Sequence, residues 1–396
     1  MLKATALVYR DAYSGLSRST WLLSVVMLIN RSGTMVVPFM MLYLTSAKMG
    51  YTIGQAGYVM GMFGAGSLAG AWLGGRLTDK IGFYPVQLAT LLGGGCLFIL
   101  LGQMKSYGLI CLFTFLVSLV NEAFRPANST AIAFYSREEN RTRSYSLNRL
   151  AINLGWALGG AIGGILAKHN YQLLFWVDGI TNLLAAVLML VFLRKAGHQP
   201  AGSARTVVAP ALSAYKDRTY LLFILLCSVY ACCFFQLFSN GLVHFEKQLH
   251  LSEPFIGLLM ALNGIIIVVV EMALIYKLEK RNRSTMYIVA GMALTGLSFL
   301  LLAIPARGVI LPVIMVTLVT IGEMLAIPFM NAYWISRTQS SNRGQYAALY
   351  TMAWSAAQII GPIGGAQVAE HFGFTTLWCI IGIVPVLAAL GIRKWT

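Results

Sequence analysis

Hydrophobic residues occupy most of the chain in long runs, separated by short segments rich in charged residues, glycine and proline. An α-helix rises 1.5 Å per residue, so about 20 apolar residues cross the roughly 30 Å hydrocarbon core of a bilayer. The runs are continuous rather than alternating, which favours helices over the strands of a β-barrel. The pattern predicts an all-helical membrane protein with spans at residues 19–45, 53–77, 86–104, 106–135, 144–168, 171–193, 219–247, 255–276, 285–304, 308–336, 344–369 and 373–392.

The longest polar interruption, residues 194–218, separates the sixth span from the seventh. It is rich in proline, glycine, alanine and basic residues, which is typical of a linker. We therefore expect residues 1–193 and 219–396 to form two six-helix bundles, joined by a cytoplasmic linker. The bundles repeat one another, because at a shift of 202 positions the second half matches the first at Pro126 and Pro328, Arg141 and Arg343, Gly159 and Gly361, and Trp176 and Trp378. A parallel six-plus-six repeat is typical of transporters that bind their substrate between the two halves.

The composition agrees with a membrane protein and explains the basic charge. Of the 396 residues, 58% are hydrophobic and 11% are charged, which excludes an ordinary water-soluble domain. The net charge of +16 is distributed unevenly: five of the 29 lysines and arginines fall in loops on one side, three fall within spans, and the rest lie on the other side. Positive charge concentrates in cytoplasmic loops, so we expect both termini in the cytoplasm and a multi-pass protein of a bacterial-type inner membrane. The charge does not indicate nucleic-acid binding.

Enzymatic chemistry has no recognisable site in the sequence. The six cysteines and five histidines show no metal-ligand or nucleophile spacing, and no GxxxxGK[ST] motif indicates ATP binding. We therefore expect neither an enzyme nor a cofactor or metal, and a proton gradient is the expected energy source. The expected partners are protons, a small-molecule substrate and the lipid bilayer, with the protein acting as a monomer.

The loop after the second span, "GGRLTDKIGFYPV", resembles the signature of the major facilitator superfamily. The matching residues are Gly75, Leu77, Asp79, Lys80 and Gly82, whereas two aromatic residues follow where the family usually has two basic ones. The resemblance implies the fold of that superfamily, with two pseudo-symmetric bundles of six helices. Gly75 is expected to allow close helix packing, Gly82 a tight turn, and Asp79 with Lys80 a latch that stabilises the outward-open state.

Two branches of the superfamily are represented in the motifs. "INRSGTMVVPFMMLYL" and "GEMLAIPFMN" are similar to twelve-helix drug:proton antiporters, which implies export of amphipathic or drug-like molecules. "RPANSTAIAFY" and "LNRLAINLG" are similar to the fourth and fifth helices of proton-coupled peptide transporters. That likeness implies short peptides or similar zwitterions as an alternative, held at their two ends by Arg31 and Glu323. A transporter-shaped receptor or regulator without turnover is the alternative from another functional class.

Three acidic residues within spans are candidate proton carriers: Glu122, Asp178 and Glu323. An ionised side chain at mid-bilayer costs a few kcal/mol, so such residues need a partner, a water-filled cavity or a proton. Glu122 and Arg125 are three positions apart and share one helix face, where they can form an ion pair. Glu323 has no basic residue one turn away, which favours a protonated carboxyl group that exchanges its proton with a cavity.

The candidate substrate ligands lie in the first and fourth spans. Arg31 and Arg125 offer guanidinium groups to an anionic substrate group, and the neighbouring Asn30 and Asn121 offer amides. Asn121 also corresponds to Glu323 in the repeat. Tyr43 is a candidate aromatic wall of the binding cavity.

Two further charges in the spans have less specific expectations. Arg149, like Arg31, is expected to compete with Arg125 for the carboxylate of Glu122. Glu271 falls nearer the inner mouth and Asp178 nearer the outer mouth, where we expect water to solvate both carboxylates.

Overall fold

The computed structural model describes residues 15–137, 141–193, 213–279, 281, 283–305, 308–338 and 343–395, and every regular element in these ranges is helical. Most of the expected linker, residues 194–212, lies outside the described residues, and its last part carries the short 3-10 helix η2 (Ala214–Lys216). The α-helices are α2 (Arg18–Ser32), α3 (Val36–Thr45), α4 (Ile53–Ile81), α5 (Phe83–Gln103), α6 (Tyr107–Tyr135), α7 (Arg141–His169), α8 (Gln172–Phe192), α9 (Arg218–Phe234), α10 (Asn240–Lys247), α11 (Glu253–Glu279), α12 (Ser284–Leu301), α13 (Ile310–Ser336) and α14 (Arg343–Trp395).

These helices supply the twelve predicted spans. In the described part of the chain, nine helical segments are long and apolar enough to cross a membrane, and α2 with α3 counts as one of them. The segment α14 contains two spans, because Gly373 interrupts it with φ 82° and ψ 162°. The helix α4 and the pair α9 and α10 provide the remaining two. The all-helical, twelve-span prediction is thus confirmed.

Side chains at the helix ends explain several of the boundaries. Thr52 begins α4 through a capping box, in which its hydroxyl accepts the Gln55 amide and the Gln55 side chain accepts the Thr52 amide. Ser17 caps α2 by accepting the Thr20 amide at 3.1 Å, and its hydroxyl donates to the Tyr135 carbonyl at the end of α6. Caps of this kind satisfy backbone N–H groups that have no partner inside the helix.

The first and seventh spans are each built from two helices. A turn at residues 33–35 separates α2 from α3, and a turn at residues 235–239 separates α9 from α10. In the second break, Gln236 donates its side-chain amide to the Gly361 carbonyl of α14 at 2.6 Å and accepts from Asn240 at 2.7 Å. The Gln236 and Ser239 side chains also donate to the backbone carbonyls of Cys232 and Phe235, at 3.3 and 2.9 Å. At this second break, side-chain contacts therefore replace part of the lost helical hydrogen bonding.

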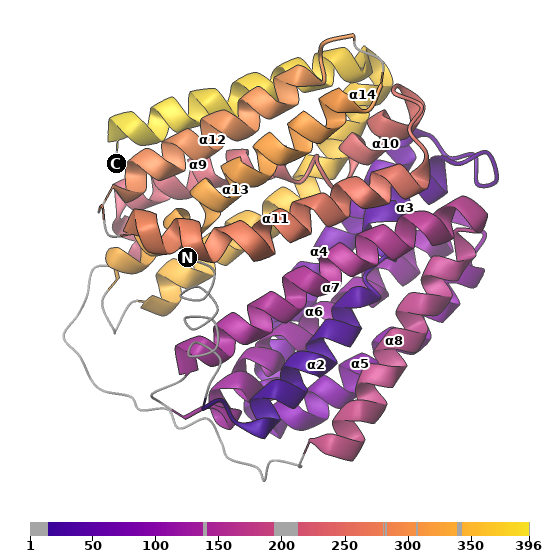
Figure 1. Cartoon of the computed structure of the whole chain (residues 1–396), viewed down its shortest axis with the longest axis vertical. Helices are drawn as coiled ribbons and strands as arrows, with labels where there is room; N and C mark the ends of the chain where they lie inside the picture. The colour runs from indigo at the N-terminus through magenta and orange to yellow at the C-terminus, as the bar shows by residue number, and fades with distance from the viewer. Residues whose placement is uncertain are drawn as a thin grey trace, which may run out of the picture.

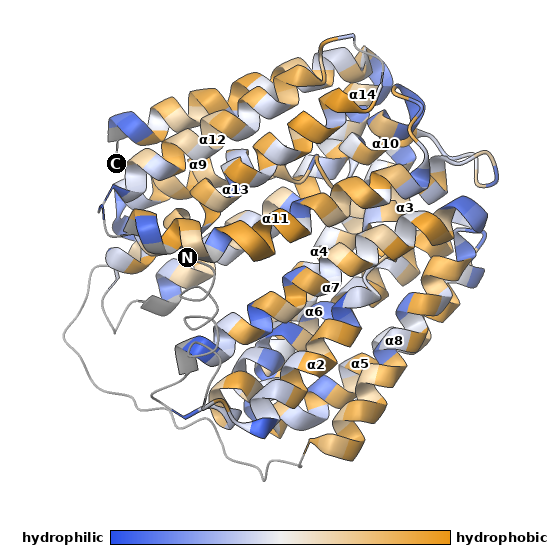
Figure 2. Ribbon diagram, viewed as in Figure 1, coloured by the Kyte–Doolittle hydropathy of each residue, from blue (hydrophilic) through white to orange (hydrophobic). Residues whose placement is uncertain are grey.

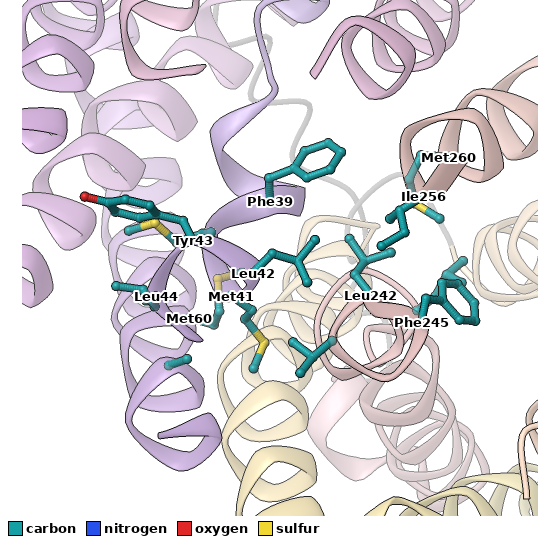
Figure 3. Packing of buried hydrophobic residues seen from close by; sticks show 14 of the residues in the cluster. Phe39, Met41, Leu42, Tyr43, Leu44, Met60, Leu242, Phe245, Ile256 and Met260 are labelled. Atoms are coloured by element: carbon teal, nitrogen blue, oxygen red, sulfur yellow. The ribbon is translucent and has the colours of Figure 1, made fainter. Parts of the chain in front are cut away.

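The helices form two bundles, with α2 to α8 in one and α9 to α14 in the other (Figure 1). The bundles touch through three helix pairs: α4 with α14, α7 with α11, and α3 with α10. Figure 3 shows apolar side chains at this junction, where Phe39 and Leu42 of α3 share one hydrophobic cluster with Leu242 of α10 and Met260 of α11.

Contacts between the bundles concentrate on the side of the molecule opposite the described chain ends. Close contacts from α4 to α14 involve Gly54, Gly57, Gly61 and Gly64, all in the first half of α4. Further along α4, glycines face α6 of the same bundle instead. The ribbons diverge towards the side on which α2 begins and α14 ends (Figure 1). The structure is therefore closed on one side and open on the other.

The outer surface of the bundles is apolar. Figure 2 shows hydrophobic residues along most of each helix and hydrophilic residues concentrated near helix ends. Large apolar side chains remain exposed on the outer faces, among them Val191 of α8, Leu225 of α9 and Ile310 of α13. Such a surface is stable against hydrocarbon and not against water, as expected for a membrane protein.

Candidate functional site: a pocket between the two bundles

A pocket of about 280 Å³ lies between the two bundles. Residues from α3, α4 and α7 of the first bundle line one side of it, and residues from α9, α11, α13 and α14 line the other. Its walls are largely apolar and aromatic, with Trp156 of α7 facing Phe234, Phe235 and Phe238 of the seventh span. The rings of Trp156 and Phe238 lie 6.1 Å apart across the junction of the two halves.

The polar groups of the pocket are few. Glu323 of α13 is the one charged side chain among the described residues that line it, and the other polar side chains include Asn153, Asn263 and Gln358. Asn263 of α11 donates its amide to the Thr320 hydroxyl at 2.9 Å and approaches the Glu323 carboxylate at 3.4 Å. A single acidic group in an apolar cavity is thus held beside one amide donor.

Glu323 alone among the predicted site residues lines this pocket. Arg31, Glu122 and Arg125 instead form a cluster within the first bundle. Glu122 and Arg125 are 3.9 Å apart at their closest side-chain atoms, and the Arg125 side chain is 78% exposed. Arg31 packs on the face of α7 at Gly155, where a Cβ atom would lie 2.6 Å from the Arg31 Cβ.

The two predicted asparagines also face other helices. Asn30 donates to Asn182 of α8 at 2.9 Å, and Asn182 in turn donates to the Asp178 carbonyl at 2.7 Å. Asn121 faces α5, because a Cβ atom on Gly94 would lie 2.9 Å from its Oδ1 atom. Both amides therefore make contacts inside the first bundle, away from the pocket.

Asp178 occupies a structural position rather than the water-accessible one expected near the outer mouth. Its side chain is fully buried, and its two carboxylate oxygens accept the backbone amides of Met35 and Val36 at 2.9 to 3.1 Å. These amides begin α3, so the carboxylate caps the second helix of the broken first span. Water solvation of Asp178 was a wrong expectation.

Tyr43 likewise lies outside the pocket. Its ring packs at 5.8 Å from Tyr171 and 5.3 Å from Phe175, inside the first bundle. Figure 3 shows the Tyr43 hydroxyl directed away from the α10 and α11 side chains. The aromatic walls of the pocket are instead those of Trp156 and the seventh-span phenylalanines. Their aromatic character is the feature of the sequence that marks them as possible cavity residues.

The expected latch lies on the open side of the molecule. Gly82 has φ 85° and is the single residue between α4 and α5, as expected for a tight turn. The close helix contact belongs to Gly74 rather than Gly75, because a Cβ on Gly74 would overlap the Ala123 backbone whereas one on Gly75 would meet nothing within 4 Å. Asp79 and Lys80 are exposed, so this open state does not test their latch role.

Arg149 and Glu271 form a direct ion pair between α7 and α11, and hence between the two bundles. The Arg149 partner is therefore Glu271 and not Glu122. The Glu271 side chain is 7% exposed, which contradicts the expected solvation, whereas Arg149 is 52% exposed.

A second acidic and basic pair closes the open-side end of the second bundle. Asp217, the N-cap of α9, accepts hydrogen bonds from Arg337 at 2.9 to 3.1 Å and from the Tyr346 hydroxyl at 3.0 Å. Burial alone would raise the pKa of Asp217, but the Tyr220 amide, Arg337 and Tyr346 outweigh it and hold that pKa below its ordinary value. The pair ties the start of α9 to the end of α13.

The sequence profile of the Major Facilitator Superfamily matches residues 21–362. The chain belongs to this superfamily. The superfamily and the relatives described below are transporters rather than enzymes, so the prediction that this protein is not an enzyme is confirmed. The chain is 22% identical over 379 residues to the MFS-type transporter YqjV of Bacillus subtilis, covering 94% of this chain and 92% of the relative. It is 23% identical to the class G tetracycline resistance protein of Vibrio anguillarum, covering 91% of this chain and 92% of the relative.

The fold of this superfamily member is shared with solved transporter structures. A peptide transporter POT in complex with sulfate superposes with a TM-score of 0.84 at 17% sequence identity, covering 96% of this chain and 95% of that one. At this level of identity the likeness concerns the fold.

Proposed function

We propose that this protein is a proton-coupled exporter of small amphipathic molecules. The observation that carries the proposal is the position of Glu323, a lone carboxyl group in an apolar pocket between two bundles. A site between two halves is the arrangement that alternating access requires, because either half can move to expose it. The similarity to a tetracycline resistance protein supports export of an organic substrate.

The lining of the pocket favours neutral or cationic amphiphiles over zwitterions. A peptide carboxylate would need a cationic partner, and neither arginine nor lysine is among the described residues that line the pocket. Aromatic faces such as that of Trp156 attract organic cations, and Glu323 supplies a full negative charge when it is deprotonated. The walls therefore fit a lipophilic cation or a neutral amphiphile better than a peptide.

Glu323 is suited to a competition between substrate and proton. A carboxylate in an apolar cavity must be neutralised by a proton or by a positive group, since an isolated charge there is strongly destabilised. Asn263 contributes one hydrogen bond at 3.4 Å, which does not neutralise the charge. A bound cation and a bound proton thus exclude one another at Glu323, and this exclusion couples their opposite movements.

The membrane orientation follows from the charge distribution in this proposal. With both termini in the cytoplasm of a bacterial-type inner membrane, the open side of the structure faces inward. The chain would then be in an inward-open state, ready to take substrate from the cytoplasm or the inner leaflet. It would act as a monomer, since each half of the pocket comes from the same chain.

The proposal is tested in proteoliposomes with an imposed pH gradient and tetraphenylphosphonium as a lipophilic cation. Wild-type protein should accumulate the cation against its gradient, and Glu323→Gln should abolish accumulation while retaining exchange of labelled for unlabelled cation. Glu122→Gln is the matched control, because Glu122 lies outside the pocket. Full gradient-driven accumulation by Glu323→Gln would remove this residue from the coupling role, and absence of proton-linked flux for neutral and cationic amphiphiles in the wild type would refute the function.

A further inference from the structure

The Arg149–Glu271 pair is the one ion pair between the two bundles among the described side chains. It lies where α7 and α11 run together, on the open side of the glycine contacts between these helices. Those contacts extend from Gly164 beside Glu253 to Gly264 beside Asn153. The ion pair thus extends the α7–α11 contact beyond the packed glycines, towards the open side.

The two partners differ in their access to water. Glu271 is 7% exposed, so its carboxylate needs either a proton or a cation to remain in place. Arg149 is 52% exposed and has a long, flexible side chain that can turn into water without loss of its charge. When the pair breaks, Glu271 alone is left as a buried charge without a partner, and protonation removes that charge.

The charged groups that face Glu271 can be assigned helix by helix. Arg149 approaches from α7, and Glu323 on α13 lies within electrostatic range of both members of the pair. The helix α10 carries Glu246 and Lys247, but Glu246 interacts with Glu253 at the opposite end of α11. Two carboxyl groups and one guanidinium thus form a triad that extends from the pocket along α11.

We propose that Glu271 is a second proton-binding group of the transport cycle, and that the proton and Arg149 compete for it. When the proton binds, a Glu271 O–H bond forms, the ion pair breaks, and the Arg149 guanidinium moves into water. Charge balance sets the order of these states. With Arg149 paired, the triad is neutral when Glu323 is protonated, and after Arg149 leaves, neutrality requires a proton on Glu271 as well.

The competition would link protonation to movement, because the two partners belong to different bundles. A deprotonated Glu271 holds α7 against α11, whereas a protonated one releases this contact. This inference rests on the proposed proton coupling at Glu323, but it concerns a separate residue and can fail independently.

Spin labels report the competition directly. Labels on Tyr145 of α7 and Lys277 of α11, both exposed and on the open side of the pair, are introduced after replacement of the six native cysteines. Their distance distribution is measured by double electron–electron resonance between pH 5 and pH 9. We expect the ratio of long to short distances to rise roughly tenfold as the pH falls, a usual size for coupling between two sites.

Two variants remove the competition from opposite sides. Glu271→Gln mimics the protonated group, and Arg149→Gln leaves Glu271 without its cation, so both should hold the longer distance at all pH values. Glu253→Gln is the matched control at the other end of α11, and it should keep the wild-type response. A wild-type distance independent of pH, or a wild-type pH response in both variants, would overturn the inference.

Transport assays separate this inference from the proposed function. Proton-linked flux in the wild type together with unchanged pH responses in Glu271→Gln and Arg149→Gln would overturn the role of Glu271 and leave Glu323 as the coupling group. Loss of the pH response in both variants without proton-linked flux in the wild type would support the proton competition at Glu271 and refute the transport function. Thermal unfolding of each purified variant, compared with Glu253→Gln, identifies any that fail to fold.

Discussion

Replacement of Asp178 by alanine should destabilise the first bundle without removing proton coupling. The Asp178 carboxylate accepts the Met35 and Val36 amides at 2.9 to 3.1 Å, in a fully buried site. Alanine would leave two buried N–H groups without an acceptor, and each costs about 1–3 kcal/mol. The free energy of unfolding should therefore fall by roughly 2–6 kcal/mol, less if water enters the space left by the carboxylate.

Unfolding of the purified protein in detergent, followed by tryptophan fluorescence, measures this loss. Asp178→Asn is the matched variant, because its one side-chain carbonyl can still accept an amide and it should lose less stability than Asp178→Ala. Folded Asp178→Asn protein should also keep gradient-driven accumulation in proteoliposomes. If Asp178→Asn is as stable as the wild type but has lost accumulation, the carboxyl group carries protons and the interpretation as a helix cap is refuted.

Two further substitutions test the contacts that hold this state. Gly164→Leu places a side chain against the backbone of Glu253 and Gly257, so the closed side should open; spin-label distances across α7 and α11 at that side should lengthen, and unchanged distances would contradict the contact. Asp217→Asn should lower stability by about 1–3 kcal/mol at pH 7, because its hydrogen bonds involve charged groups. Since the folded pKa of Asp217 is depressed, this contribution is present above its unfolded value near 3.9 and is lost as the pH falls through the folded pKa. The gap in thermal stability between wild type and variant should therefore close in acid, and a gap independent of pH would contradict the ion pair.

The spans could be predicted from the sequence because their signal is long and one-dimensional. Twenty consecutive apolar residues have few alternatives to a helix in hydrocarbon, so the twelve spans were located with small errors in their ends. The second span was predicted to end at residue 77, whereas α4 continues to Ile81. Its last turn is polar and lies beyond the apolar run, and hydropathy cannot recognise such an extension.

The site was harder to predict, because burial at mid-membrane does not reveal which way a residue faces. Glu122 and Glu323 both follow long apolar runs, yet only Glu323 lines the pocket. Asp178 is likewise an acidic residue within an apolar span. The sequence does not show that the first span breaks into α2 and α3, so it does not show that the Asp178 carboxylate caps the start of α3. The Arg149–Glu271 pair joins residues 122 positions apart on different bundles, and no local spacing indicates such a pair.

The two bundles repeat one another, but at some pairs of corresponding positions the first bundle has neutral groups where the second has charged ones. Ser17 and Asp217 are the N-caps of α2 and α9, and Tyr135 and Arg337 lie at the ends of α6 and α13. The first pair is joined across its bundle by a neutral hydrogen bond of 2.7 Å from Ser17 to Tyr135, and the second by an ion pair between Asp217 and Arg337. In the same way, Asn121 of the first bundle corresponds to Glu323 of the second. The repeated scaffold places the two halves around one pocket, while the second half supplies the titratable groups beside it. Glu323→Gln gives position 323 a neutral carboxamide like that of Asn121 and removes the titratable group. It is therefore the substitution expected to separate substrate exchange from proton-driven transport.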